Sequence, residues 1–300
     1  MQRLLVVYNP RSSRYSNLKN EVLNRLPELK GFIIGKYEVI KTDVDQNANQ
    51  LSKIIKDGDL VLAVGGDATG VIAVNAILKS NKDATLAVLP YGNFNDLART
   101  LGTKSLDEIL KNNPKKLYPL EILIDGKHFR YATCYVTIGM MGEAVKLYDT
   151  PKLRRKLKTK FGRKISSYTQ LASWYFKNRH KKQFLPEFKL NGELQPKKTS
   201  DYAAVNGKFM ARVMKGGNDY EKPHVFRSET DQLTNFWRLF KLMAKSIFKQ
   251  IPGSKTSGDV LEFIEPSSFE LQAEGEYRTF NGINKIEIRK SEKCLKAIMK

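Results

Sequence analysis

Residues 60–78 read LVLAVGGDATGVIAVNAIL, and this stretch decides the fold class. Leu60 to Val64 is a short continuous apolar run, which is typical of a strand buried on both faces in a parallel sheet. The run leads into Gly65-Gly66-Asp67, and a helix-like apolar segment from Val71 to Leu78 follows. A buried strand, a glycine loop and a helix in that order predict one unit of an α/β fold.

The same order of strand, loop and helix recurs four times in the first 101 residues. The expected strands are 4–8, 37–40, 60–64 and 86–89, and the expected helices are 16–26, 47–55, 71–78 and 95–101. Such repetition predicts an open parallel α/β sheet, in which ligands bind at the carboxyl ends of the strands. Three unusual loops, after residues 8, 64 and 89, are expected at that edge.

After about residue 120 the pattern changes to alternating, β-rich segments with hairpin-type turns. The turn dipeptides are Asp125-Gly126, Asn191-Gly192 and Asn281-Gly282. The expected strands are 122–124, 130–138, 187–190, 202–205, 260–264, 269–272 and 285–289, with helical insertions at about 161–180 and 231–249. We therefore expect an α/β domain over residues 1–122 and an antiparallel β-sandwich over 123–290, with 291–300 as a segment that can return to the first domain.

The charge balance points to phosphate-bearing partners. The chain has 52 Lys and Arg against 31 Asp and Glu, a net charge of +21, which suits nucleic acid or anionic lipid. Two cysteines and three histidines without metal-ligand spacing argue against a disulfide scaffold and a zinc module, and favour a reduced, cytosolic setting. With no signal peptide and no run of eighteen uncharged apolar residues, we expect a soluble protein or one on a membrane surface.

Each of the three loops suits phosphate binding. The glycine loop, residues 65–69, lets backbone N–H groups approach a phosphate, and Asp67 there would orient Mg²⁺, water or a basic group. The Pro-Gly loop, residues 90–99, opens a helix at Asn95-Asp96, and the N-terminal loop, residues 9–13, adds hydroxyls and an arginine. The alternative for Asp67 and Asn95 is an ordinary helix cap.

Taken in order, these loops resemble the diacylglycerol kinase catalytic-domain family, the bacterial soluble lipid kinases related to sphingosine and ceramide kinases. The motifs that carry the resemblance are Asn9-Pro10-x-Ser12, Gly65-Gly66-Asp67-x-Thr69, Pro90-x-Gly92-x-x-Asn95-Asp96-x-Ala98-Arg99, Gly139 to Ala144, Asn206-Gly207 with Gly216-Gly217, and residues 272–276. The resemblance implies a Rossmann-like α/β domain of the NAD-kinase/phosphofructokinase type followed by a β-sandwich.

The resemblance also implies site residues. ATP would contact Asn9, Pro10, Arg11, Ser12, Ser13, Thr42, Gly65, Gly66, Asp67, Ala68, Thr69, Gly70, Val71, Asn93, Asn95 and Asp96. Glu276 matches the general base and Asp67 is the second catalytic candidate, in a reaction that needs positioning and charge neutralisation above all. Ser228, Asp231 and Leu233 match the ligands of a structural Mg²⁺. Without the resemblance, an exposed hairpin glutamate is the favoured interpretation of Glu276.

The sequence departs from the family pattern at several phosphate-facing positions. Ala68 and Ser13 stand where glycine is usual, and Asn93-Phe94 replaces threonine and a small residue. A Cβ at residue 68 would clash with phosphate or forbid a positive φ. Asp231-Gln232-Leu233-Thr234-Asn235 also departs from the usual metal-site pattern. These departures keep open a catalytically weak or inactive relative that binds lipid or nucleotide.

Two segments suit a membrane surface. Residues 151–182 hold twelve Lys and Arg, no acidic residue, and Trp174-Tyr175-Phe176. Each basic residue near an anionic bilayer contributes roughly 1 kcal/mol. Residues 233–248 form a basic amphipathic pattern. A solvated helix face and ordinary core packing are the respective alternatives.

The leading hypothesis is an ATP- and Mg²⁺-dependent lipid kinase that acts on a membrane alcohol such as diacylglycerol. Its partners would be ATP, the lipid and an anionic membrane surface, in a cytoplasmic and peripherally membrane-associated protein; a homodimer is left open. A non-catalytic relative and a kinase of a soluble substrate such as a nicotinamide dinucleotide are the alternatives. Nucleic-acid binding is not expected, because neither stacking aromatics on a sheet nor a groove-reading helix is evident.

Overall fold

The computed structural model describes the α/β part almost completely and the second part in pieces. The described residues are 1–40, 43–139, 173, 188–194, 199–210, 214–215, 224–229, 251, 254–257, 260–264 and 268–300. The expected helical insertions and the basic segment 151–182 lie outside these ranges, apart from residue 173. Within the described ranges, no helix combines the length and the apolar character needed to cross a membrane.

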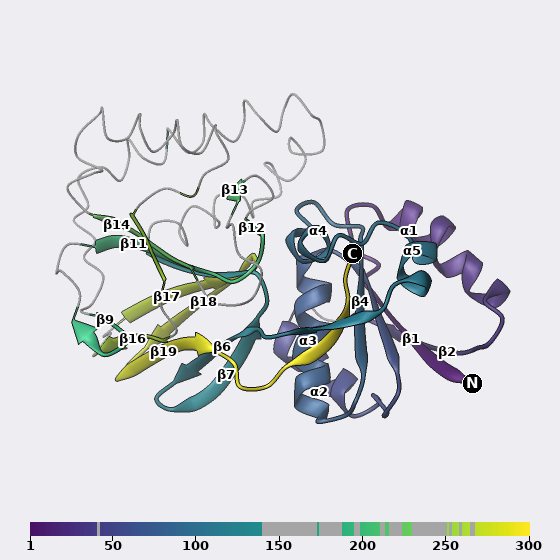
Figure 1. Ribbon diagram of the computed structural model, residues 1–300, viewed down its shortest axis with the longest axis horizontal. Coiled ribbons are helices and arrows are strands. Elements are labelled where there is room, and N and C mark those ends of the chain that lie inside the picture. Colours follow the sequence, from purple (N-terminus) through teal and green to yellow (C-terminus); the bar gives the residue numbers. More distant parts are fainter. Residues whose placement is uncertain are drawn as a thin grey trace.

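Six strands form the sheet of the α/β part. Their order is β2 (Phe32–Glu38), β1 (Gln2–Tyr8), β3 (Leu60–Gly65), β4 (Thr85–Pro90), β20 (Leu295–Ile298) and β5 (Pro114–Leu117). All neighbours are parallel except β20 and β5. Every residue of β3 is buried, as its continuous apolar run predicts. Figure 1 shows the last strand crossing from the β-sandwich back to this sheet.

Helices follow the strands in the expected alternation. They are α1 (Tyr15–Glu21), the 3₁₀ helix η1 (Leu23–Glu28), α2 (Val44–Ser52), α3 (Asp67–Ser80), α4 (Asp96–Leu101) and α5 (Leu106–Lys111). The predicted single helix 16–26 is wrong, because α1 ends at Glu21 and the chain tightens into a 3₁₀ turn that contains Pro27. Strand β2 starts at Phe32, five residues before the predicted strand at 37, and ends before Ile40.

Two antiparallel sheets make up the second part. One has the order β10 (Glu193–Leu194), β9 (Phe188–Leu190), β16 (Val260–Ile264), β19 (Lys285–Lys290), β6 (Leu120–Ile124) and β7 (Lys127–Ala132). The other has the order β15 (Ser254–Ser257), β14 (His224–Glu229), β11 (Thr199–Val205), β8 (Tyr135–Gly139), β17 (Ser268–Ala273) and β18 (Glu276–Asn281). Residues of both sheets share one buried apolar cluster, and the predicted fold class is confirmed.

One predicted strand of the sandwich is wrong. Residues 130–138 form two strands, β7 and β8, which belong to different sheets. Thr133 and Cys134 connect them, and both are buried at the turn from one sheet to the other. The chain therefore passes from one sheet to the other at residues 133–134, which we call the crossing point. The sequence did not indicate it, because the apolar pattern does not change where the chain leaves the first sheet.

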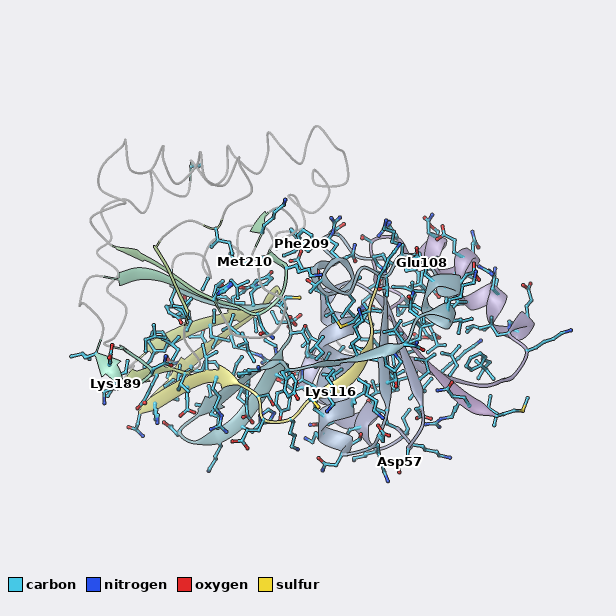
Figure 2. The ribbon with its side chains drawn as sticks, in the orientation of Figure 1. Asp57, Glu108, Lys116, Lys189, Phe209 and Met210 are labelled. Carbon is cyan, nitrogen blue, oxygen red and sulfur yellow. The ribbon has the colours of Figure 1, made fainter. Side chains whose placement is uncertain are left out.

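The two parts are packed through a common core. Cys134, Tyr135 and Met210 of the second part lie in the same apolar cluster as Leu97 and Leu101 of α4. Met210 belongs to the short strand β12 (Phe209–Met210), which pairs with β13 (Met214–Lys215). Figure 2 shows Phe209 and Met210 where the two parts meet. A shared core fixes the loops of the sheet relative to the sandwich.

Candidate active site

The glycine loop and the Pro-Gly loop touch at two glycines. A Cβ added to Gly66 would lie 3.3 Å from the Cα of Gly92, and one added to Gly92 would overlap the Cα of Gly66. Asn95 closes the Pro-Gly loop, because its Oδ1 accepts from Gly92 N at 2.7 Å and its Nδ2 donates to Gly92 O at 2.8 Å. Gly92 therefore leaves no room for a side chain, whereas a Cβ at Gly66 would require only a small shift of the opposing loop.

Asp67 joins the two loops by its side chain. Its Oδ2 accepts from Asn95 N at 2.8 Å and its Oδ1 accepts from Asp96 N at 2.6 Å. Asp67 therefore caps the N-terminus of α4. The sequence instead predicted a cap for the helix that follows Asp67 in the chain, which is α3. Burial raises the pKa of the Asp67 carboxyl above its usual range, against the lowering by the two backbone N–H groups. Both carboxyl oxygens are held by the neighbouring loop.

Two buried hydroxyls lie beside Gly65. A Cβ added to Gly65 would lie 3.2 Å from Ser12 Oγ and would overlap Thr69 Oγ1. Within the described part of the chain, neither hydroxyl has a hydrogen-bond partner. Thr69 is 1% exposed and lies in the first turn of the fourteen-residue helix α3, where the helix dipole favours anions. Because residue 65 is glycine, both hydroxyls can pack closely against the backbone of the glycine loop.

The remaining N-terminal loop residues and three arginines lie at the same strand ends. Asn9 Oδ1 accepts from Arg11 N at 2.9 Å, which folds the loop before Ser12. Arg14 donates to Pro90 O and stacks over the Tyr91 ring at 5.7 Å from its centroid. Of the other predicted residues of this loop, Pro10 is half-buried and Ser13 is exposed.

Arg14 is a site residue that the sequence interpretation missed, although a basic residue after a hydroxyl-rich loop was a usable signal. Arg11 Nη2 lies 3.4 Å from Val39 O, and Arg99 Nε donates to Phe94 O at 3.0 Å. Carbonyl oxygens therefore orient the three guanidinium groups around the loops.

Several predicted nucleotide-binding residues lie in the packing around α3. A Cβ on Gly70 would lie 2.9 Å from Leu97 Cδ2, and Val71 is buried in the shared cluster, so both pack α3 against α4. Ala68 lies inside α3 and packs on that cluster. The expectation that a Cβ at residue 68 forbids the required φ is wrong, because the backbone there is helical. Phe94 is 38% exposed, next to Asn93 in the Pro-Gly loop.

Glu274 and Glu276 flank a tight hairpin turn between β17 and β18. Glu274 and Gly275 have φ of 50° and 90°, the signature of a type I′ turn, in which an Asp-Gly or Asn-Gly pair is preferred. Glu274 Oε1 accepts from Thr133 N at 2.8 Å, from Thr133 Oγ1 at 2.6 Å and from Cys134 N. The longer glutamate side chain thus holds the crossing point between β7 and β8.

Glu276, the predicted general base, is the first residue of β18 and is half-buried. Because side chains alternate along a strand, it lies on the same face of β18 as Arg278. The guanidinium of Arg278 reaches Asp43 and Asp45 of the α/β part. The face of β18 that carries Glu276 is therefore directed toward the start of α2 in the α/β part.

Three carboxyl groups raise the pKa values of two buried side chains where the α/β part meets the sandwich. The pKa values of Cys134 and Tyr135 are raised well above their usual ranges, mainly by burial and further by the charges of Glu274, Asp96 and Asp67. Burial raises the pKa of Glu274 to about 7, despite its hydrogen bonds to Thr133 and Cys134. The two loops and the hairpin turn thus meet in one electrostatically connected region.

The predicted metal ligands lie almost wholly outside the described residues. Asp231 and Leu233 are not in the described ranges, and Ser228 is described only as backbone of β14, opposite Asp201. The predicted nucleotide contact Thr42 also lies outside the described ranges. In the part of the chain that the structure covers, no group of three or more His, Cys, Asp or Glu side chains could hold a metal ion.

The fold and the loops define a class of protein: residues 3–129 match the family model of the diacylglycerol kinase catalytic domain. The first part of the chain is therefore similar to that catalytic domain, and the resemblance drawn from the motifs is confirmed.

Individual curated proteins are also similar to this chain in sequence. Over 174 residues the chain is 30% identical to a diacylglycerol kinase of Bacillus subtilis, which covers 54% of this chain and 52% of the relative. A diacylglycerol kinase of Staphylococcus carnosus is 28% identical over 39% of this chain and 40% of its own. The chain thus matches about half the length, or less, of these curated relatives.

A solved structure extends the likeness in fold to the whole chain. The crystal structure of a diacylglycerol kinase from Bacillus anthracis strain Sterne has a TM-score of 0.65, covering 100% of this chain and 97% of that one, at 15% identity. At that identity the likeness concerns the fold alone.

Proposed function

We propose that the chain transfers the γ-phosphoryl group of ATP to a hydroxyl group of a membrane lipid such as diacylglycerol. One observation carries the proposal: the hydroxyls of Ser12 and Thr69 are buried beside Gly65 without a partner in the described residues. Leaving a buried donor unpaired costs about 1–3 kcal/mol. A site that keeps two such donors at a helix N-terminus suits a ligand rich in acceptor oxygens, and a nucleotide phosphate is such a ligand.

The remaining roles are assigned around that phosphate site. Arg14 and Arg99 are placed to neutralise phosphate charge, since guanidinium groups bind phosphate oxygens well. Asp67 acts by holding the Pro-Gly loop against the glycine loop, which fits its two backbone hydrogen bonds. Glu276 takes the proton from the lipid hydroxyl as general base. Its place on the strand face of Arg278 supports this role.

Other expectations are kept as proposals. We propose that residues 1–122, with 291–300, form the nucleotide-binding domain and that 123–290 form the lipid-substrate domain. The Mg²⁺ site at Ser228, Asp231 and Leu233 stays a prediction, as does the membrane contact through 151–182. That Mg²⁺ would be structural, whereas a Mg²⁺ ion bound together with ATP would supply charge neutralisation at the phosphates.

The proposal is tested with radiolabelled ATP and mixed-lipid vesicles. We expect lipid-dependent transfer, and we expect Ser12→Ala and Thr69→Val to raise the KM for ATP about tenfold or more, because hydrogen bonds to charged groups are worth about 1.5–3 kcal/mol. Ser80→Ala is the control, since its hydroxyl bonds to Ile77 O at the other end of α3. No transfer to any of several lipid classes would refute the proposed activity. An unchanged KM in both variants would refute the phosphate site.

A further inference from the structure

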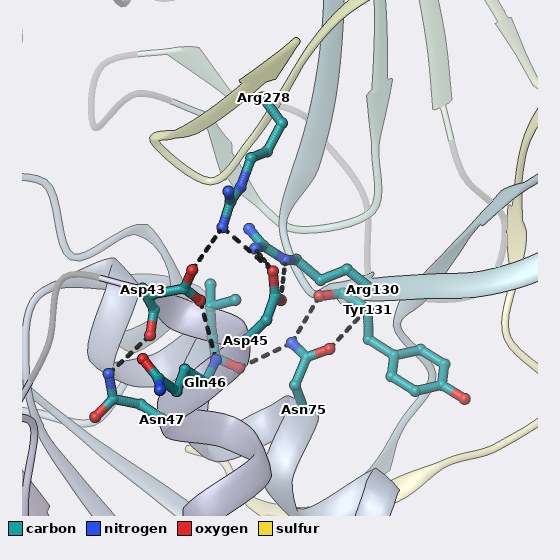
Figure 3. A network of polar contacts seen from close by, with 9 residues as sticks. Asp43, Asp45, Gln46, Asn47, Asn75, Arg130, Tyr131 and Arg278 are labelled. Atoms are coloured by element: carbon teal, nitrogen blue, oxygen red, sulfur yellow. Dashed lines mark hydrogen bonds and ion pairs between the residues drawn. The ribbon is translucent and has the colours of Figure 1, made fainter. Parts of the chain in front are cut away.

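Two aspartates at the start of α2 face two arginines of the sandwich (Figure 3). Arg130 of β7 binds Asp45 through two of its three guanidinium nitrogens, with Nε 2.9 Å from Oδ1 and Nη2 2.6 Å from Oδ2. Arg278 of β18 lies 3.3 Å from Asp43 Oδ2 and 3.4 Å from Asp45 Oδ2. Four charges from two parts of the molecule thus form one network.

The two arginines differ in burial, and this separates their roles. The Arg130 side chain is 1% exposed, so the loss of Asp45 would leave a buried cation without its partner. The Arg278 side chain is 39% exposed and its ion pairs are longer. Exposed ion pairs contribute little to stability. We therefore expect Arg130 to be needed for the stability of the fold. Arg278, by contrast, can be replaced without unfolding the protein.

Strand β7 is fixed to the α/β part by a second contact. Asn75 of α3 donates to Tyr131 O at 3.0 Å and accepts from Tyr131 N at 2.8 Å, so its amide pairs with the backbone of the strand (Figure 3). Helix α3 begins at Asp67 in the glycine loop. The position of β7 relative to that loop therefore does not depend on Arg278.

Strand β18 packs on β7 through the rings of Phe280 and Phe129, and it reaches the α/β part through the ion pairs of Arg278. Among the described strands it is the edge strand of its sheet and pairs only with β17. Arg278 lies on the same face of β18 as Glu276, two residues away. The ion pairs of Arg278 connect this edge strand to α2, whose N-cap residue is Asp43.

We propose that Arg278 is a positioning residue, whose ion pairs with Asp43 and Asp45 hold β18, and with it Glu276, against the nucleotide-binding part of the chain. The inference rests on the proposed function, since it assigns Arg278 an effect on the general base. Arg278 itself need not touch either substrate. Loss of the ion pairs would let the β18 edge move and would misplace the Glu276 carboxylate at the moment of proton transfer.

Kinetics of matched variants test the inference. We expect Arg278→Gln to lower kcat at least tenfold while the KM for ATP stays within twofold, and Arg278→Lys to restore most of kcat because it keeps the charge. Arg289→Gln is the control, because Arg289 is 35% exposed and pairs with Glu121 and Glu287 on the other sheet. An unchanged kcat in Arg278→Gln, or an equal loss in Arg289→Gln, would overturn the inference.

Hydrogen exchange supplies a readout that needs no activity. We expect the backbone amides of Tyr277–Phe280 to exchange faster in Arg278→Gln than in the wild-type chain, and unchanged exchange there in Arg289→Gln. Unchanged exchange in Arg278→Gln would overturn the inference even for an inactive protein. A wild-type chain that transfers no phosphate to lipid refutes the proposed function instead, so the two failures are distinguishable.

Discussion

Replacing Glu274 by glutamine should remove a large part of the pH dependence of stability. The pKa of Glu274 is raised from 4.5 to about 7, so the folded chain binds a proton that the unfolded chain has released between these values. The free energy of unfolding therefore falls as pH rises through this window. At about 1.4 kcal/mol per unit, the loss is roughly 3 kcal/mol above pH 7. Glutamine carries no charge and lacks this loss.

The glutamine variant also keeps the important hydrogen bonds. Its Oε1 can accept from Thr133 and Cys134 as the carboxylate does. The NH₂ group of the glutamine would take the place of Oε2, an atom that has no hydrogen-bond partner in the described residues. We therefore expect Glu274→Gln to be more stable than the wild-type chain at pH 8 and similar at pH 5.

Urea unfolding between pH 5 and pH 8 measures the difference directly. The wild-type and variant curves of stability against pH should diverge progressively above pH 5. Parallel curves for Glu274→Gln would mean that the hydrogen bonds of Glu274 outweigh its burial, and the reasoning would be refuted.

Three further substitutions test the contacts between the loops and between the two parts by urea unfolding. Asp67→Asn should cost about 2 kcal/mol, because one of its two backbone bonds is lost and an amide donor faces an N–H group; no loss would show that the cap is dispensable. Asn75→Leu should cost about 2–4 kcal/mol, because two buried backbone groups of Tyr131 lose their partners; a change below about 1 kcal/mol would contradict this. Gly92→Ala should destabilise the protein by about 1–3 kcal/mol more than Gly66→Ala, because only a Cβ at residue 92 overlaps the opposing loop. A larger loss in Gly66→Ala would contradict this.

The sequence was sufficient for the α/β order because each strand is short, apolar and followed by a loop with glycine or proline. It was insufficient where the local signal was weak. Helix α5 was not predicted, although Ser105 and Glu108 form a capping pair in which Ser105 Oγ accepts from Glu108 N at 3.3 Å. The break at Thr133 was invisible because buried residues continue through it.

The site was predictable only as a set of loops. The glycine and Pro-Gly loops were identified from their residue types, and the structure brings them into contact. The partner of each side chain was not predictable, because Asp67 bonds to backbone groups 28 and 29 residues away and Glu274 to residues 141 and 140 away. Such pairings depend on tertiary packing. Arg130 and Arg278 gave no signal at all, since neither lies in a motif.

The placement of β20 has a consequence for how the chain assembles. This strand, which is the last in the sequence, separates β4 from β5 in the sheet of the α/β part. A ribosome must therefore synthesise the whole sandwich before β5 can find its neighbour, and contacts so distant in sequence slow folding. Excising residues 1–122 as an independent fragment would leave a sheet with an open gap and an unprotected, aggregation-prone edge at β4.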